Sequence, residues 1–306
     1  MSNMENVNSE HAQEKTKTKK KWITPKTFPY ILVFPAVLLF VVFTVYPVIS
    51  SFLLSFQASE GGVMSFVGFQ NYIRLFNDGL FYQSLINTFT ILIIQVPIMI
   101  TLAILLAVML NSALIRFNGF FRVSFFLPSV TALVTASIVF IILLDGNYGI
   151  VNYVLSTIGL EKVSWLNDPF WAKVSIMLVV TWRWTGYNMV ILLAGLQNVS
   201  QDLYESASID GAGKVRQFFY ITLPQLKPVI LFTVVLSTIG TLQLFDEPYI
   251  LTNGGPNNST LTVIMYLYDQ GFRYFDFGYA SAIAYVLVII IAVLSWIQLR
   301  LGSDRD

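Results

Sequence analysis

The stretch Leu203-Tyr-Glu205-Ser-Ala-Ser-Ile-Asp210-Gly211-Ala-Gly-Lys-Val-Arg-Gln-Phe218-Phe-Tyr-Ile221-Thr-Leu-Pro224-Gln-Leu-Lys-Pro228 is a polar segment between two strongly apolar ones. Its residues favour helix as far as Asp210, and Gly211 can form a turn with positive φ. A second short helical stretch follows, which we expect Pro224 to stop. The segment predicts a helical hairpin, with its loop at about residues 197–228, that presents a docking surface.

The composition around this hairpin is that of a membrane protein. Only 11% of the 306 residues are charged and 56% are hydrophobic, whereas a soluble domain carries about 25% charged residues. Such a chain cannot cover itself with a water-compatible surface, so it belongs in a bilayer. The net charge of +1 gives no indication of nucleic-acid binding, and the absence of cysteine excludes disulfides, thiolate catalysis and cysteine zinc sites.

Six apolar runs approach the roughly 20 residues that are needed to cross a bilayer as a helix. They are Tyr30 to Phe56, Phe89 to Leu110, Phe125 to Leu144, Val174 to Leu196, Val229 to Phe245 and Ala280 to Leu299. The fifth run is the shortest, and we expect it to extend toward Leu251. The sequence therefore predicts an all-α integral membrane protein with six transmembrane helices.

The distribution of Lys and Arg sets the orientation of these spans. Thirteen of them lie in the N-terminal tail, the second loop, the hairpin and the C-terminus, whereas the intervening loops hold four. The positive-inside rule places the positively charged side in the cytoplasm. Both termini and the hairpin are thus predicted to be cytoplasmic, which agrees with an even number of spans.

The domain organisation is simple. Residues 1–28 form a polar, Lys-rich cytoplasmic tail that we expect to be attracted to anionic membrane lipids. Residues 29–306 form one transmembrane domain. Aromatic residues in the outer loops are typical of anchors at the membrane interface.

Catalytic motifs are missing from the sequence. The segment Gly211-Ala-Gly213-Lys214-Val215 resembles a phosphate-binding loop only in part, because Val215 supplies no hydroxyl for magnesium. No metal-ligand constellation is present either. We predict that the chain is not an enzyme and does not hydrolyse ATP, so active transport would draw its energy from another subunit or from an ion gradient.

Two transport mechanisms stay open at this point. Ion-coupled carriers usually bury carboxylates in their spans, and the six apolar cores contain none, which weakens that alternative. The charges nearest to the cores are Arg183 in the fourth run and Asp246 with Glu247 at the outer end of the fifth. We hypothesise a contact between Arg183 and Asp246, since an extended Arg side chain could span most of the difference in membrane depth between the two residues.

Polar and aromatic residues interrupt the apolar pattern near these charges. Sugars present hydroxyls to amides and carboxylates and C–H faces to aromatic rings, which suits a polyol pathway. Polar residues that fasten helices together are an equally good explanation for any single one of them. The candidate substrate-binding residues are Trp184, Tyr187, Asn188, Gln243, Phe245 and Asp246.

Several motifs resemble the permease subunits of ATP-binding-cassette (ABC) importers. The pattern Glu-x-Ala-x-x-Asp-Gly-Ala followed by Phe-x-x-Ile-x-Leu-Pro in the hairpin is similar to the cytoplasmic coupling loop of that family. Further similar segments are Asn87-Thr88, Phe121-Arg122 and Phe126-Leu127-Pro128-Ser129. Two stretches, 249–256 and 275–282, look like maltose-type carbohydrate permeases in particular, and Ser206 stands where the family usually has Ala.

The resemblance implies a type I ABC importer permease fold in a bacterial cell membrane. It also implies the coupling residues Glu205, Ala207, Asp210, Gly211 and Ala212, which would sit in a cleft of the ATPase. The implied partners are a second homologous permease chain, a dimer of ABC ATPase subunits that hold ATP and Mg, and an extracytoplasmic sugar-binding protein. The sequence does not identify the sugar, and another small solute such as glycerol phosphate stays open.

Overall fold

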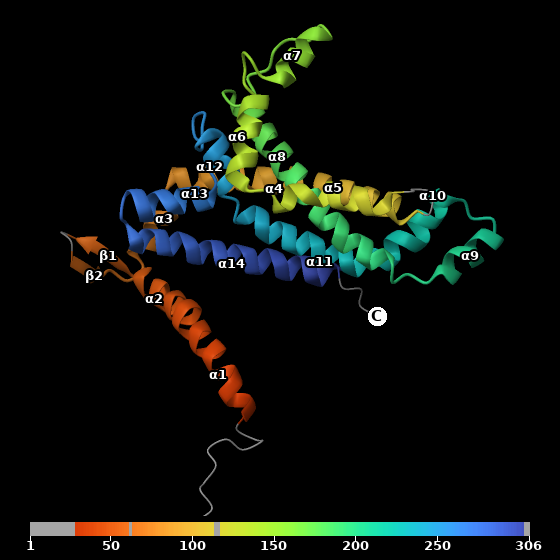
Figure 1. Ribbon diagram of the computed structural model, residues 1–306. Coiled ribbons are helices and arrows are strands. Elements are labelled where there is room, and N and C mark those ends of the chain that lie inside the picture. Colours follow the sequence, from red (N-terminus) through yellow and green to blue (C-terminus); the bar gives the residue numbers. More distant parts are fainter. Residues whose placement is uncertain (1–27, 61–62, 113–116, 303–306) are drawn as a thin grey trace, which may run out of the picture. The chain divides into compact units, whose positions relative to one another are not determined.

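The computed structural model describes residues 28–60, 63–112 and 117–302, and the regular elements among them are helices apart from one short β-hairpin (Figure 1). The Lys-rich tail of the sequence analysis lies outside the described residues, except for Phe28. The chain forms two structural units, one up to Ser50 and one from Ser51 onward.

The first unit holds most of one apolar helix, Phe28–Leu54, which ends four residues into the second unit. This helix consists of α1 (Phe28–Phe40), a π-helical turn (Val41–Val45) and α2 (Tyr46–Leu54). None of its side chains is buried. A predominantly apolar helix of 27 residues is long enough to span a membrane.

The second unit contains all the other elements. The strands are β1 (Gln57–Glu60) and β2 (Val63–Phe66), and the helices before the hairpin are α3 (Gln70–Leu75), α4 (Gly79–Asn111), α5 (Asn118–Val130), α6 (Leu133–Leu143), α7 (Ile150–Thr157) and α8 (Pro169–Leu196). The remaining helices are α9 (Gln201–Ile209), α10 (Lys214–Gln217), α11 (Leu223–Leu242), α12 (Asp246–Thr252), α13 (Val263–Tyr268) and α14 (Phe277–Gly302), with π-helical turns at Phe218–Thr222 and Asp269–Arg273.

Five helices in the described part of the chain are long and apolar enough to span a membrane, and a bent pair makes a sixth candidate. The six predicted runs are thereby confirmed as helical. The third run is bent rather than continuous, because α5 and α6 meet at an angle of 96°. The break follows Pro128, and Thr131 at the end of α5 adopts an extended conformation.

The fifth span differs from the prediction at both ends. Pro224 does not stop the helix, which runs unbroken from Lys214 to Leu242. The π-helical turn before it explains this, because the backbone N–H of Leu223 bonds to the carbonyl of Phe218 five residues back, which shifts the register ahead of the proline. The predicted extension toward Leu251 is also wrong, since the helix ends at Leu242 and α12 begins separately at Asp246.

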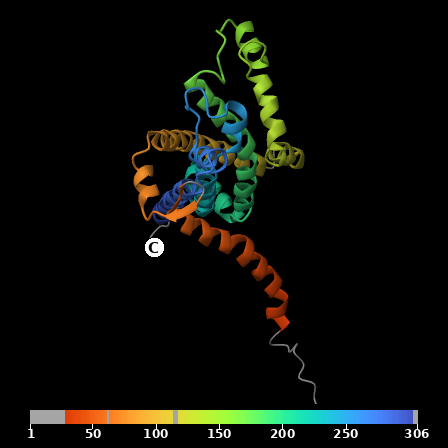
Figure 2. The same ribbon diagram turned by 90° about the vertical axis from the view of Figure 1, so that its left-hand side faces the viewer.

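Helix α4 lies at the centre of the second unit, where it packs against α8, α11 and α13, while α14 packs against α11 (Figure 2). Three clusters of buried hydrophobic side chains join these helices. Helices α6 and α7 project away from this bundle in both views. The bundle therefore provides a packed frame, and α6 and α12 border the space where polar side chains gather.

Candidate functional site

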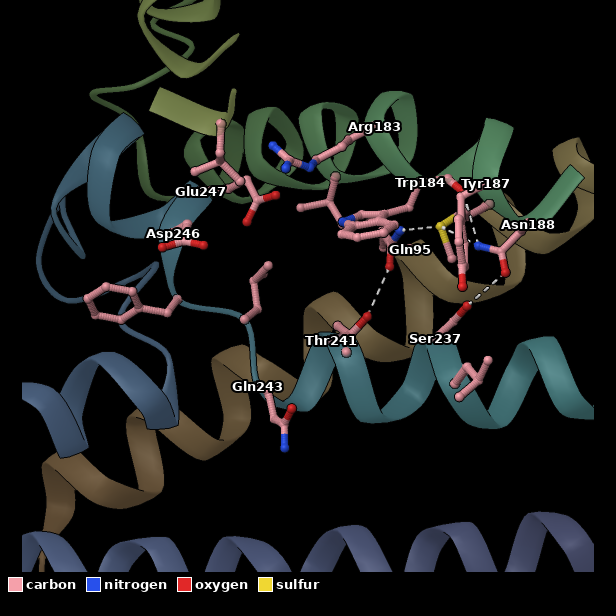
Figure 3. A pocket seen from close by; sticks show the side chains of 17 residues that line it. Gln95, Arg183, Trp184, Tyr187, Asn188, Ser237, Thr241, Gln243, Asp246 and Glu247 are labelled. Atoms are coloured by element: carbon pink, nitrogen blue, oxygen red, sulfur yellow. Dashed lines mark hydrogen bonds between the residues drawn. The ribbon is translucent and has the colours of Figure 1, made fainter. Parts of the chain in front are cut away.

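A cavity of about 440 Å³ opens within the second unit, bordered by α4, α6, α8, α11 and α12 (Figure 3). Its size lies within the range of about 300–1,000 Å³ that is typical of small-molecule sites. All six candidate substrate-binding residues line it, together with these further residues: Gln95, Met99, Leu133, Val180, Arg183, Leu236, Ser237, Gly240, Thr241, Leu244 and Glu247. The sequence-predicted set is thus gathered around one cavity.

The break between α11 and α12 makes room for this cavity. Helix α11 ends at Leu242, and an irregular segment carries Gln243 and Phe245 into the lining. The backbone polar groups of such a break need partners, and the hydroxyl of Thr262 donates to the carbonyl of Leu244 at 2.7 Å. The first turn of α12 then places Asp246 and Glu247 at the cavity.

Two aromatic side chains of α8 form one wall. The rings of Trp184 and Tyr187 meet edge to face with centroids 5.7 Å apart. They are 37% and 38% exposed, so part of each side chain is accessible. Phe245 lies on the opposite segment and stacks on Tyr249 at 5.0 Å.

Three charged side chains line the cavity. The guanidinium of Arg183 points toward Glu247 (Figure 3) and lies 5.6 Å from the ring of Trp184. Glu247 is buried and lies outside the long spans; burial raises the pKa of its carboxyl, whereas the charge of Arg183 opposes that rise. The hypothesised contact between Arg183 and Asp246 is absent from the ion pairs of the described residues, and Nε of Arg183 is buried without a hydrogen-bond partner. The charge of Arg183 acts on Glu247 instead, because α12 turns that residue inward and leaves Asp246 exposed.

Amide and hydroxyl side chains form the other wall. The amide of Asn188 donates to the carbonyl of Trp184 at 3.1 Å and accepts from the hydroxyl of Ser237 at 3.4 Å. Likewise, the hydroxyl of Thr241 donates to Gln95 at 3.4 Å. Asn188 and Gln95 are both buried, so the network fastens α4, α8 and α11 together where they border the cavity.

The sequence analysis did not select Gln95, Met99, Ser237 or Thr241. Gln95 is an amide in the middle of the apolar run 89–110, which is a usable signal because polar groups are costly in a span. Met99 and Ser237 carry no such signal, since methionine and serine are ordinary residues of packed membrane helices. Only the crossing of α4, α8 and α11 brings these residues to one place.

The predicted hairpin is present, and its turn has a specific geometry. Glu205 and Ala207 lie on α9, Asp210 caps its C-terminus, and Gly211 has φ +78°. The N–H of Ala212 bonds to the carbonyl of Ala207 at 2.8 Å, and the N–H of Gly211 bonds to the carbonyl of Ser208 at 3.1 Å. These two bonds form a Schellman motif, in which the residue at Gly211 must adopt a left-handed conformation.

Comparison with known proteins identifies the family. Residues 76–304 match the family described as "Binding-protein-dependent transport system inner membrane component". This match covers α4 to α14, and hence the cavity and the hairpin together.

Individual relatives are similar to this chain along nearly its whole length. The lactose transport system permease protein LacF of Rhizobium radiobacter is 48% identical over 283 residues, which cover 90% of this chain and 94% of LacF. The arabinooligosaccharides transport system permease protein AraP of Bacillus subtilis (strain 168) is 41% identical and covers 91% of this chain and 90% of its own length.

Solved structures show the same fold. A bacterial ABC transporter involved in the import of the acidic polysaccharide alginate superimposes with a TM-score of 0.80 at 24% identity, covering 90% of this chain and 94% of that one. In such systems a separate subunit hydrolyses ATP, and the membrane component is not catalytic. The chain belongs to the family of binding-protein-dependent transport system inner membrane components, and it is the multi-pass membrane permease of an ABC transporter.

Proposed function

We propose that this chain imports a neutral carbohydrate through the cavity between α8, α11 and α12. The observation that carries the proposal is the joint lining of one cavity by the rings of Trp184 and Tyr187 and by the carboxylate of Asp246. Aromatic faces pack against sugar C–H groups, and exposed carboxylates and amides bind hydroxyls. The exposed amide of Gln243 and the ring of Phe245 complete the proposed set, with Asn188 supporting the wall.

The charges of the cavity favour a neutral solute over an anionic one. Asp246 and Glu247 face a single guanidinium, that of Arg183. A phosphate or an acidic sugar would meet two carboxyl groups, whose negative charge would repel it. Hydroxyls, in contrast, can donate to these carboxylates and accept from the guanidinium.

Three of the relatives have names that fit this substrate class. LacF is named for lactose and AraP for arabinooligosaccharides, and both are neutral saccharides. A trehalose/maltose permease protein, MalF of Thermococcus litoralis, is 31% identical over 278 residues. We therefore propose a neutral saccharide of one or a few units as the transported solute.

The hairpin is the proposed contact with the ATPase. Its tip exposes two apolar side chains, Ile209 at 87% and Val215 at 72%, beside the charged groups of Glu205 and Asp210. Exposed aliphatic residues on an otherwise polar hairpin are typical of a protein contact. Glu205, Ala207, Asp210, Gly211 and Ala212 would dock into the ATPase, which holds ATP and Mg.

The proposed assembly has five chains. It consists of this permease, a second homologous permease, two ATPase subunits and an extracytoplasmic sugar-binding protein. A solved alginate ABC transporter with the same fold was crystallised in complex with a periplasmic protein carrying an alginate pentasaccharide, which supports a comparable delivery step here.

Uptake in cells that lack their own copy of the permease tests the substrate site. We expect Trp184→Leu to raise the KM for the saccharide at least tenfold, because the loss of one stacking surface of about 1.4 kcal/mol has that effect. Asp246→Ala should also raise the KM for the saccharide. Trp182→Leu is the matched control, since Trp182 is on the same helix and packs against Phe140.

The choice of competitor tests the substrate class. Neutral mono-, di- and trisaccharides should compete with labelled substrate, whereas uronic acids and sugar phosphates should not. Preferential competition by the acidic compounds, or an unchanged KM in both cavity variants, would refute the proposed site.

A further inference from the structure

Gln217 is a buried amide at the base of the hairpin. It is the last residue of α10, and only 4% of its surface is exposed, although the three residues before it are exposed. The side chain contributes neither to the cavity nor to the exposed tip of the hairpin. Its position between α9 and the π-helical turn Phe218–Thr222 calls for a different role.

The side-chain amide of Gln217 connects three points of the hairpin. Its Nε2 donates to Oγ of Ser208 at 2.8 Å, to the carbonyl of Ala212 at 3.1 Å and to the carbonyl of Tyr204 at 3.4 Å. An amide carries two N–H bonds, so the three acceptors share them. One side chain thus joins two turns of α9 and the loop that follows it to α10.

A second connection lies next to the first. The hydroxyl of Tyr204 on α9 lies 3.0 Å from Oγ1 of Thr222, which is buried at the end of the π-helical turn. Oγ1 of Thr222 also donates to the carbonyl of Gln217 at 3.4 Å. Helix α9 is therefore bonded both to the residue just before the π-helical turn and to the last residue of that turn.

The loop that these bonds cross would otherwise bend easily. It contains Gly211 and Gly213, and neither glycine would meet a neighbouring atom if it carried a Cβ. Glycine is the residue with the greatest backbone freedom. Without the side-chain bonds, α9 could move relative to α10 and α11, and a displacement of α9 would be absorbed in the loop.

We propose that Gln217 is a positioning residue that couples α9 rigidly to the fifth span. The inference rests on the proposed docking of the ATPase at α9. The helix from Lys214 to Leu242 has 29 residues, or roughly 43 Å at 1.5 Å per residue. Its far end carries Ser237, Gly240 and Thr241 at the cavity, so a rigid joint at Gln217 transmits movement of the hairpin to the solute site.

The test uses the complete transporter in proteoliposomes with its binding protein. Gln217→Leu has a similar size and removes every donor. We expect the ATPase subunits to stay bound and to hydrolyse ATP, while the amount of solute transported per ATP falls at least tenfold. Gln225→Leu is the matched control, because Gln225 is an exposed residue of the same continuous helix, and it should leave the ratio unchanged.

Three results would overturn the proposal. A wild-type ratio of transport to hydrolysis in Gln217→Leu would show that the joint is not needed. Loss of ATPase binding in that variant would show that Gln217 only supports the docking surface. If the variant does not reach the membrane, the milder double variant Tyr204→Phe/Ser208→Ala is tested in its place. A wild-type ratio of transport to hydrolysis in that double variant would overturn the proposal as well.

Two further variants separate this inference from the proposed function. The chain has no cysteine of its own, so Ser208→Cys combined with Gln217→Cys can be joined by a short bifunctional thiol reagent. The joined form should regain the transport ratio that the unjoined form lacks. Gly211→Pro disrupts the turn itself. If this variant retained ATPase binding and uptake, the proposal that the ATPase docks at α9 would be refuted, whatever the result for Gln217.

Discussion

At the scale of single residues, Asp78 illustrates how one side chain can join three elements. It caps α4 by accepting from the N–H groups of Leu80 and Phe81, and it also accepts from the hydroxyls of Tyr266 in α13 and Tyr279 in α14. Burial alone would raise the pKa of Asp78, but these four donors outweigh it and hold the pKa below its ordinary value of 3.8.

Replacement of Asp78 should therefore be more harmful than loss of an ordinary helix cap. Loss of a cap costs about 1 kcal/mol, and two tyrosine hydroxyls left without their partner add about 1–3 kcal/mol. Asp168→Ala is the matched control, because Asp168 caps α8 through Phe170 and Trp171 alone. Thermal unfolding in detergent should show a larger decrease in Tm for Asp78→Ala; equal decreases would contradict the account.

The same carboxylate predicts the effect of pH on stability. Because the native pKa is lowered, the stabilisation is fully present above about pH 3.8 and is lost as the pH falls through the native value. The acid-induced decrease in Tm should thus be smaller in Asp78→Ala than in the wild type.

At the scale of residues, the sequence predicted which side chains line the cavity better than it predicted which side chains interact with one another. The six cavity residues could be selected because polar and aromatic groups stand out in apolar runs, and Gln95 could have been added for the same reason. Which of the two carboxyl groups the charge of Arg183 acts on could not be predicted, because it depends on how α12 turns Asp246 and Glu247 relative to α8. Burial of Gln217 could not be predicted either, since an amide in a polar hairpin gives no sign of being enclosed.

At the scale of elements, hydropathy located every span but not the irregularities within them. The bend between α5 and α6, the π-helical turn before Pro224 and the break after Leu242 all lie within or beside continuous apolar sequence. Close packing accompanies the first of these features, since helix α5 can lie across α8 because Gly186 lets the two backbones come close together.

Gly186→Ala should separate α5 from α8. A Cβ at this position would overlap the carbonyl oxygen of Phe125, and backbone atoms cannot move aside as a flexible side chain can. We expect a loss of stability of about 3 kcal/mol, measured as a lower Tm and a lower yield of folded protein. Gly119→Ala is the control on α5, since a Cβ there meets nothing within 4 Å; equal behaviour of the two variants would disprove the close crossing.

At the scale of the second unit, one continuous helix connects the two functional regions. The helix from Lys214 to Leu242 begins beside the Schellman turn of the hairpin and ends beside the cavity. The sequence predicted both regions but divided this helix at Pro224. The continuity supports the central claim that a movement imposed on the hairpin by an ATPase opens or closes the solute cavity.

Uptake into proteoliposomes that contain the whole transporter tests this claim most directly. ATP is supplied on the side of the ATPase subunits, and labelled saccharide is supplied with the binding protein on the other side. The account predicts that the wild type accumulates saccharide only with ATP and regardless of ion gradients. It also predicts that Gly211→Pro, which cannot adopt φ +78°, is inserted but inactive, whereas Gly213→Ala behaves as the wild type. Gradient-driven uptake without ATP, or full activity of Gly211→Pro, would contradict it.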